Sequence, residues 1–117
     1  MNNLKITTKP TERRDTAVVI PAGSINSSTV PHLDSCFGEL FGKGVRTVVV
    51  DLSETEFISS SGVGLLLGSV SSLREKDGDL VLMNIPSLIN DIFDILNIKM
   101  HFRIIDSLDD LKTAAGT

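Results

Sequence analysis

Two stretches near the start of the chain are candidate β-strands, and the first of them alternates between apolar and polar residues. The first is LKITT at residues 4–8, and the second is TAVVIPAG at residues 16–23. Such alternation is typical of β-strands that bury one face. The polar turn sequence KPTERRD lies between the two stretches. The pattern therefore predicts an opening β-hairpin.

The apolar positions then change to helical spacing. Hydroxyl residues at 27–29 are N-cap candidates, Pro31 suits a first helical turn, and Gly42 and Gly44 favour an end to the helix. One face of this helix carries Val30, Leu33, Phe37, Leu40 and Phe41. The β-branched run VRTVVVD at 45–51 follows and predicts a central strand that delivers its last residue, an aspartate, to a loop.

The second half of the chain continues the alternation of helices and strands. A second helix is predicted from about residue 60, a strand at 79–84, and a third helix from Pro86 to a possible end at Asn97. A short strand at 100–106 follows, and a capping pair then predicts a terminal helix. The apolar faces of these helices are Val63, Leu66, Leu67, Val70 and Leu73; Leu88, Ile89, Ile92, Phe93 and Leu96; and Leu108, Leu111 and Ala114.

This order of elements, β-β-α-β-α-β-α-β-α, predicts an α/β fold. Helical crossovers join the later strands, so we expect those strands to be parallel. The result is a mixed, mostly parallel sheet of about four to five strands with about four helices, in a single domain over residues 1–117. Sites in such sheets tend to lie at the carboxyl ends of strands, which is where residues 51–62 fall.

Composition narrows the classes of function. The chain is 41% hydrophobic and 22% charged, which is enough apolar surface for a core. Its net charge is −4 and it contains no Trp or Tyr, which disfavours a nucleic-acid partner. Cys36 has no intrachain partner, and no apolar run is long enough for a signal sequence or membrane insertion. We expect a soluble cytoplasmic protein.

Three adjacent serines, Ser59, Ser60 and Ser61, stand in the segment FISSSGVG at residues 57–64. With a helix starting near residue 60, one hydroxyl would cap the first backbone N–H groups. Capping leaves two hydroxyls unexplained. A helix N-terminus also accommodates a phosphate, and a phosphoserine would add a charge of roughly −1.5 to −2. A purely structural role and a modification site both remain open.

The outer face of the same helix is composed mainly of small residues. Helical projection gathers Ser61, Gly68 and Ser72 around Leu65, opposite the apolar face. Either another part of the domain or a partner protein covers this leucine.

Enzymatic chemistry has weak support in the sequence. A serine hydrolase needs a base, and nothing brings His32 or His101 to the serines. The glycines at 62, 64 and 68 miss the dinucleotide-binding spacing by one position, no Walker lysine follows, and helix packing explains them better. One cysteine and two separated histidines form no metal-ligand set. We predict a protein that is not an enzyme, with no cofactor and no metal site.

The segment VVVDLSETEFISSSGVGLLLGSV resembles the STAS domain, and above all the bacterial anti-sigma factor antagonists. In that family an apolar strand ends in Asp-Leu. A short loop and an aromatic-aliphatic pair then lead to Asp-Ser-Ser/Thr-Gly-Leu-Gly at the start of a helix. Residues 48–68 match this signature, and the flanking elements follow the order of the family over essentially the whole chain. The resemblance implies the STAS fold.

The resemblance also implies a phosphorylation switch at Ser60. In the family, a serine-kinase anti-sigma factor with an ATPase-like kinase fold phosphorylates this serine, and a PP2C-type phosphatase removes the phosphate. The unphosphorylated antagonist binds the kinase and frees a sigma factor, so the implied role is transcription regulation by partner switching. The expected partner-binding residues are Asn26, Ser27, Ser59, Ser61, Gly62, Val63 and Leu65.

Two positions depart from the family pattern. Ser59 replaces the Asp that usually precedes the acceptor, and Asn26 stands in a loop that often carries Asp. Both changes remove a carboxylate from the predicted kinase-facing rim. The partner then differs in charge, or phosphorylation is weaker, or Ser59 is the acceptor. A second possible function is a constitutive STAS subunit of a larger assembly, such as a lipid-transport ATPase, with no phosphorylation cycle.

Overall fold

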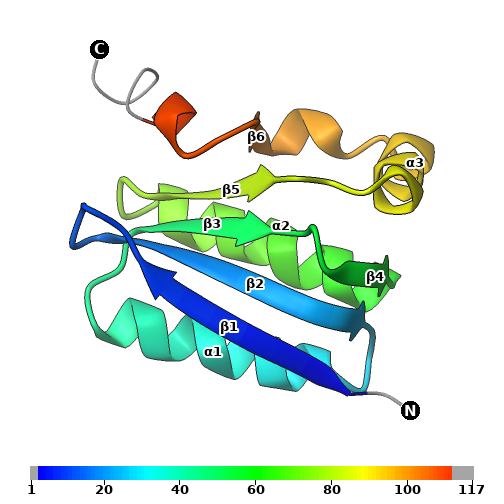
Figure 1. Cartoon of the computed structure of the whole chain (residues 1–117), viewed down its shortest axis with the longest axis horizontal. Helices are drawn as coiled ribbons and strands as arrows, with labels where there is room; N and C mark the ends of the chain where they lie inside the picture. Colours follow the sequence, from blue (N-terminus) through cyan, green and yellow to red (C-terminus); the bar gives the residue numbers. More distant parts are fainter. Residues whose placement is uncertain (1–2, 112–117) are drawn as a thin grey trace.

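A computed structural model describes residues 3–111 of the 117-residue chain. The elements follow the order β-β-α-β-β-α-β-α-β, with one 3-10 helix before the last strand (Figure 1). In sequence they are β1 (Leu4–Pro10), β2 (Thr16–Ile25), α1 (Val30–Gly42), β3 (Thr47–Asp51), β4 (Thr55–Ile58), α2 (Ser60–Arg74), β5 (Asp79–Met83), α3 (Ser87–Leu96), η1 (Lys99–His101) and β6 (Arg103–Ile105).

The predicted opening hairpin is confirmed, and its second strand organises the sheet. β1 and β2 pair antiparallel, with Leu4 opposite Gly23 and Pro10 opposite Ala17. β2 is ten residues long, so its first half pairs in parallel with β3 and its second half with β4. Within the pairing of β2 with β4, the register shifts between Gly23 and Ser24. β2 therefore runs from the β1–β2 turn to the edge of the sheet at which β4 also ends.

The sheet is mixed and mostly parallel, as predicted, with the order β1-β2-β3-β5-β6 and with β4 paired to β2 outside this path. Because the parallel strands follow one another in sequence order, right-handed crossovers place their helices on the same face of the sheet. Figure 1 shows α1 and α2 together behind the sheet, while α3 lies beyond the carboxyl end of β5.

Apolar side chains pack on both faces of the sheet. The larger cluster lies between the sheet and the helices and includes Phe37, Leu66 and Phe93, all fully buried. Along β3, Val48 and Val50 join this cluster, whereas Val49 joins a smaller cluster on the opposite face. A strand that buries both faces needs an unbroken apolar run, which explains the sequence VVV.

The structure departs from the predicted elements in three places. β4 forms inside the segment predicted to be a loop after Asp51, which adds a strand to the expected sheet. The first part of the predicted strand 100–106 is the helix η1, so that only residues 103–105 pair with β5. Residues 109–111 begin the predicted terminal helix, and its Ala114 lies outside the described residues.

The predicted apolar face of α3 is only partly buried. Ile89 and Phe93 are in the core, whereas Leu88 is 54% exposed and Leu96 is 45% exposed. The helical spacing was right, but the extent of burial was wrong. The reason is the position of α3 beyond the end of β5, where only one side of the helix meets the rest of the domain (Figure 1).

Candidate functional site

Strand pairing brings two polar segments together at one edge of the sheet. Ile25 at the end of β2 pairs with Ile58 at the end of β4. Asn26 follows the first of these residues and Ser59 follows the second. The Ser59 N–H also donates to the Ile25 carbonyl at 2.8 Å. The sequence placed these segments 33 positions apart (59 minus 26), and the structure makes them neighbours at the carboxyl ends of their strands.

The three serines of the cluster have different environments. The half-buried Ser59 is the N-cap of α2, and its Oγ accepts the Gly62 N–H at 3.3 Å. Its Oγ also lies 2.8 Å from the Ser61 Oγ, within hydrogen-bond distance. Ser60 is the first residue of α2 and is exposed, and its hydroxyl has no hydrogen-bond partner within residues 3–111. Ser59 therefore caps α2, Ser61 lies within hydrogen-bond distance of the capping hydroxyl, and Ser60 faces solvent.

The start of α2 suits an anion on the middle serine. First-turn N–H groups lack intrahelical acceptors, and the helix dipole gives this end a partial positive charge. Ser59 satisfies the N–H groups of Gly62 and Val63, through its side chain and its carbonyl respectively. The N–H groups of Ser60 and Ser61 have no such partner in the part of the chain that the structure describes. The start of α2 therefore carries backbone donors that the cap does not use.

Two of the predicted partner-binding residues, Gly62 and Val63, are buried within the domain. A Cβ atom at Gly62 would lie 2.7 Å from Ile25 Cγ2 and 2.7 Å from Ile58 Cγ1. Glycine at this position therefore lets α2 approach the ends of β2 and β4. That Gly62 and Val63 contact a partner remains a prediction.

The other glycines of α2 do not serve packing within the domain. A Cβ atom at Gly64 or Gly68 would meet nothing within 4 Å. The packing role predicted for all three glycines therefore holds for Gly62 and is wrong for the other two. They form a small-residue outer face, and its exposed residues are Ser60, Ser61, Gly64, Gly68, Ser71 and Ser72.

Leu65, the predicted partner-binding leucine, is half-buried beside this outer face. Part of its side chain packs against the larger core cluster. The domain therefore covers some of Leu65 and leaves the rest accessible. Cover by the domain itself is confirmed for part of the side chain, and contact with a partner remains a prediction.

The loop before α1 uses its polar side chains internally. Asn26 Oδ1 accepts the N–H groups of Ser28 at 2.9 Å and Thr29 at 3.2 Å. Thr29 is the N-cap by position but makes no side-chain cap bond; its Oγ1 accepts the Asn26 N–H at 2.9 Å and donates to the Ser24 carbonyl at 2.8 Å. Ser27 is exposed. The predicted hydroxyl cap is replaced by this asparagine turn.

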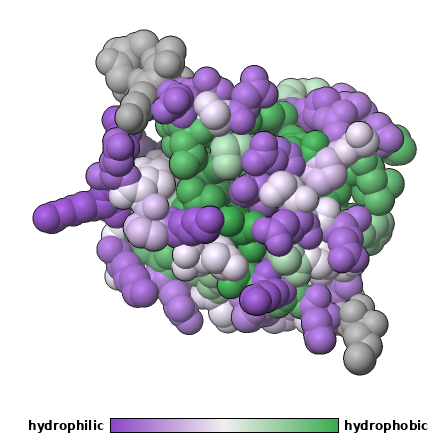
Figure 2. Space-filling model, in the orientation of Figure 1, coloured by the Kyte–Doolittle hydropathy of each residue, from purple (hydrophilic) through white to green (hydrophobic). Residues whose placement is uncertain are grey.

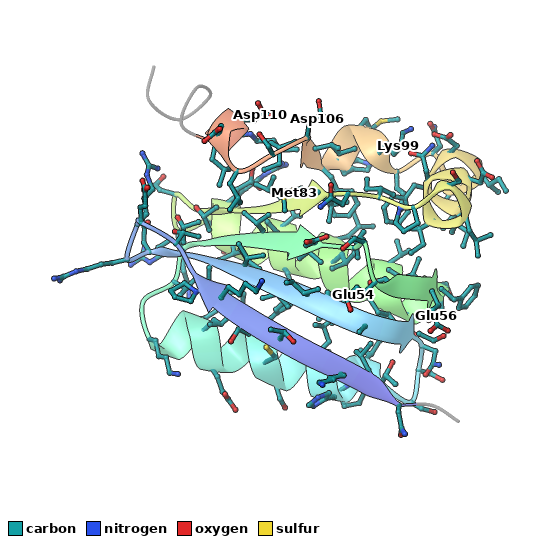
Figure 3. All side chains as sticks on the ribbon, viewed as in Figure 1. Glu54, Glu56, Met83, Lys99, Asp106 and Asp110 are labelled. Atoms are coloured by element: carbon teal, nitrogen blue, oxygen red, sulfur yellow. The ribbon has the colours of Figure 1, made fainter. Side chains whose placement is uncertain are left out.

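Carboxylates lie at the end of β3 and along β4, the strand that leads to the serines, despite the two substitutions noted in the sequence. Glu54 and Glu56 are exposed at and just before β4 (Figure 3). Asp51, at the end of β3, accepts the Ser53 N–H at 3.0 Å and an Asn84 side-chain N–H at 3.2 Å. The edge of the sheet that carries the serines is therefore acidic.

Metal, hydrolytic and thiol chemistry each require particular side-chain groups. Within residues 3–111 there is no cluster of three or more His, Cys, Asp or Glu side chains suited to a metal ion, and no hydrogen bond joins Ser60 to His32 or His101. Burial raises the pKa of the Cys36 thiol, and Glu39 raises it further, so the thiolate is disfavoured. Over the same range, no helix has the length and apolar character to span a bilayer.

Comparison with known proteins identifies the family. The STAS domain family matches residues 8–111. This chain belongs to the STAS-domain family. The match covers both the serine cluster and the loop before α1, in agreement with the resemblance seen in the sequence.

Individual relatives of this STAS domain carry names from one functional class. The chain is 30% identical to a putative anti-sigma factor antagonist, BtrV, of Bordetella bronchiseptica, over 81% of this chain and 82% of that protein. It is 28% identical to the anti-sigma-B factor antagonist of Staphylococcus aureus, over 68% of this chain and 75% of that protein.

Solved structures share the fold of this STAS domain. The anti-sigma factor antagonist SpoIIAA in its unphosphorylated form superposes with a TM-score of 0.76 at 20% identity, over 98% of each chain. The phosphorylated form of the Bacillus protein SpoIIAA superposes with a TM-score of 0.68 at 20% identity, over 98% of this chain and 100% of that one. At this identity the likeness concerns the fold alone.

Proposed function

We propose that this protein is an anti-sigma factor antagonist that acts in the bacterial cytoplasm as a phosphorylation switch. In its unmodified form it binds a serine-kinase anti-sigma factor, and phosphorylation of Ser60 releases it. A PP2C-type phosphatase restores the binding form. The protein itself is a binding partner and not an enzyme. The observation that carries the proposal is the exposed, unengaged Ser60 hydroxyl at the N-terminus of α2.

The environment of the serines favours Ser60 over Ser59 as the acceptor. A kinase must reach the hydroxyl oxygen with the γ-phosphate of ATP, so the oxygen has to be accessible. Ser59 is half-buried and its Oγ is engaged with Gly62 and Ser61, whereas Ser60 is exposed.

Charge provides the mechanism of release. The proposed contact surface comprises Ser60, the small outer face of α2, the exposed part of Leu65 and Ser27 in the neighbouring loop. Glu54 and Glu56 already make this edge acidic. A phosphate buried in the contact around Ser60 would lose its hydration without gaining a cationic partner there, and an unpaired charge buried at an interface costs several kcal/mol. That cost lowers affinity by about a hundredfold or more.

The named relatives support the antagonist over a constitutive subunit of a transport assembly. BtrV and the Staphylococcus aureus protein are both named as antagonists. The phosphorylated and unphosphorylated forms of SpoIIAA share the fold of this chain, which supports a modification that leaves the domain folded.

Phosphosite mapping on protein isolated from its native cells, resting and stressed, tests the proposal directly. We expect phosphate on Ser60 in amounts that change with the condition. The kinase responsible is then purified, and its affinity is measured for Ser60→Asp, Ser60→Ala and the wild type. We expect Ser60→Asp to lose binding and Ser60→Ala to bind constitutively, with the melting temperatures of all three nearly equal.

Ser35→Asp provides the matched control, because Ser35 is an exposed serine on α1 and the substitution adds the same charge. It should bind as the wild type does. Absence of phosphate from residues 59–61 in every condition, or tight binding of Ser60→Asp, would refute the switch.

A further inference from the structure

Helix α3 carries more apolar surface than the domain buries. Ile89 and Phe93 are the buried residues of this helix. Ile95 is 82% exposed, Leu88 is 54% exposed and Leu96 is 45% exposed. Isolated exposed leucines are ordinary, but a gathering of large apolar side chains marks an interaction surface.

These side chains form one continuous stripe. Leu88, Ile92 and Ile95 follow the i, i+4, i+7 spacing that aligns residues on one helix face, and Leu96 borders them. β4 packs against α3 and adds Phe57, which is 44% exposed. Figure 2 shows apolar surface at the edge of the molecule where α3 lies in Figure 1. We call Phe57, Leu88, Ile92, Ile95 and Leu96 the α3 patch.

The segment that follows α3 turns away from this patch. The Lys99 Nζ lies 3.0 Å from Asp94 Oδ1 and 3.0 Å from Asn90 Oδ1. Helical projection places Asp94 and Asn90 on the side of α3 away from Leu88 and Ile95. Among residues 3–111, η1 therefore anchors to the polar side of the helix and leaves the apolar stripe uncovered.

The border of the α3 patch is acidic. Glu54 and Glu56 lie on the β4 side (Figure 3), and Asp91 lies beside the stripe on α3; all three are exposed. Several cations lie in the loops at the other end of the parallel strands, namely Arg13, Arg14, Lys43, Arg46 and Lys76. The complement of this surface is an apolar ridge bordered by Lys or Arg side chains.

The α3 patch is also continuous with the proposed switch. Phe57 precedes Ser60 by three positions, and β4 leads directly into the cap of α2. A partner docked on the start of α2 would therefore reach the patch without a separate binding event. The patch itself contains no serine and would be unchanged in charge by phosphorylation.

We propose that the α3 patch is a second contact for the serine-kinase anti-sigma factor, which seats an amphipathic helix with a basic border against Phe57 and α3. This inference rests on the proposed function and specifies its partner surface. The switch at Ser60 sets whether the complex persists, and the patch supplies apolar contact that brings the kinase to its substrate.

The test uses the kinase purified through its activity on Ser60, and it measures kcat/KM for phosphorylation of the full-length chain. Ile95→Ser removes the most exposed apolar side chain, and isoleucine and serine have similar helix propensities. We expect kcat/KM to fall about tenfold or more, as for a central interface residue. Leu108→Ser is the matched control, because Leu108 is 40% exposed but lies next to the β1–β2 turn. It should stay within about twofold of wild type.

The charge of the border is tested separately. Glu56→Lys should lower kcat/KM and weaken the dependence of binding on salt, because it removes an attraction to basic side chains. Glu75→Lys makes the same change at the exposed end of α2, among the cations, and should leave kcat/KM near the wild-type value. Melting temperatures of all four variants show that each is folded.

The outcomes separate the two proposals. The α3 patch is not a kinase contact if Ile95→Ser and Glu56→Lys leave kcat/KM unchanged while Ser60→Asp still loses binding. The proposed switch at Ser60 would stand in that case. Failure to find any kinase that acts on Ser60 overturns both. A wild-type dimer that Ile95→Ser dissociates would show that a second copy of this chain occupies the patch, which also overturns the inference.

Discussion

The loops that lead into α1 and α2 are both rich in small polar residues, yet they use them in different ways. Before α1, Asn26 and Thr29 direct their side chains into the loop and satisfy its backbone. Before α2, Ser59 caps the helix, and Ser60 is left exposed with no partner in residues 3–111. The first loop is a structural element, and the second contains a hydroxyl that the fold does not need.

This difference also explains the substitution at position 26. Asn26 acts as a hydrogen-bond acceptor through Oδ1, a role that an aspartate carboxylate performs equally well. Asparagine therefore preserves the turn and removes only the charge. At Ser59 the hydroxyl preserves the cap in the same way. The two departures from the family pattern change the electrostatics of the surface and leave its architecture intact.

The largest effect should come from removing the Thr29 hydroxyl. Thr29 is 3% exposed, and Thr29→Val keeps its shape but leaves the Asn26 N–H and the Ser24 carbonyl without their partner. We expect the free energy of unfolding to fall by about 2–3 kcal/mol. Ser60→Ala should change it by less than about 0.5 kcal/mol. Urea denaturation measures both, and equal losses would show that the two loops do not differ as described.

Gly62→Ala should cause the second largest loss of stability. The added methyl would lie 2.7 Å from side-chain atoms of Ile25 and Ile58. Overpacking of this kind costs about 1–3 kcal/mol, because α2 must shift away from the ends of β2 and β4. Thermal and urea denaturation should both show the loss. If Gly62→Ala did not change stability, the N-terminus of α2 would be free to shift. That result would contradict a fixed position for Ser60.

Removing the side-chain cap of α2 should lower the free energy of unfolding by a smaller amount. Ser59→Ala removes the acceptor for the Gly62 N–H and should cost about 1 kcal/mol. Ser59→Asp retains an acceptor, adds a favourable charge at the helix N-terminus and should cost nothing. Urea denaturation measures both variants, and equal stability of Ser59→Ala and the wild type would show that the Ser59 hydroxyl does not cap α2.

Much of this architecture follows from the spacing of apolar residues. The hairpin, the three main helices and the central strands are long enough for periodicity to define them. β4 is four residues long, and its formation depends on β2 extending past its pairing with β3. No local pattern in the sequence TEFI contains that information, and the segment was predicted as a loop.

The chemistry at the site depended on tertiary contacts in the same way. The sequence indicated that three serines exceed the needs of one cap, and it proposed Ser60 from the family resemblance. It could not assign the cap to Ser59 or the exposed position to Ser60, because both follow from the pairing of Ile25 with Ile58. Likewise, the pattern alone gave Gly62 and Gly64 the same packing role, although their surroundings differ completely.

The smallest effect on stability gives the sharpest test of the outer face of α2. Gly64 is an exposed glycine inside a helix and would have no neighbour to its Cβ within 4 Å. Gly64→Ala should therefore stabilise the fold by about 0.5–1 kcal/mol. If a partner approaches this face closely, the same methyl group should weaken kinase binding while the protein becomes more stable.

Gly38 in α1 is the matched control, because it too is exposed, helical and open around its Cβ. Gly38→Ala should give the same gain in stability with no change in kinase affinity. Affinity by calorimetry and stability by urea denaturation, measured on both variants, separate helix propensity from contact. Unchanged affinity for Gly64→Ala would place the close approach of the partner elsewhere, nearer to Ser60 and the α3 patch than to the middle of α2.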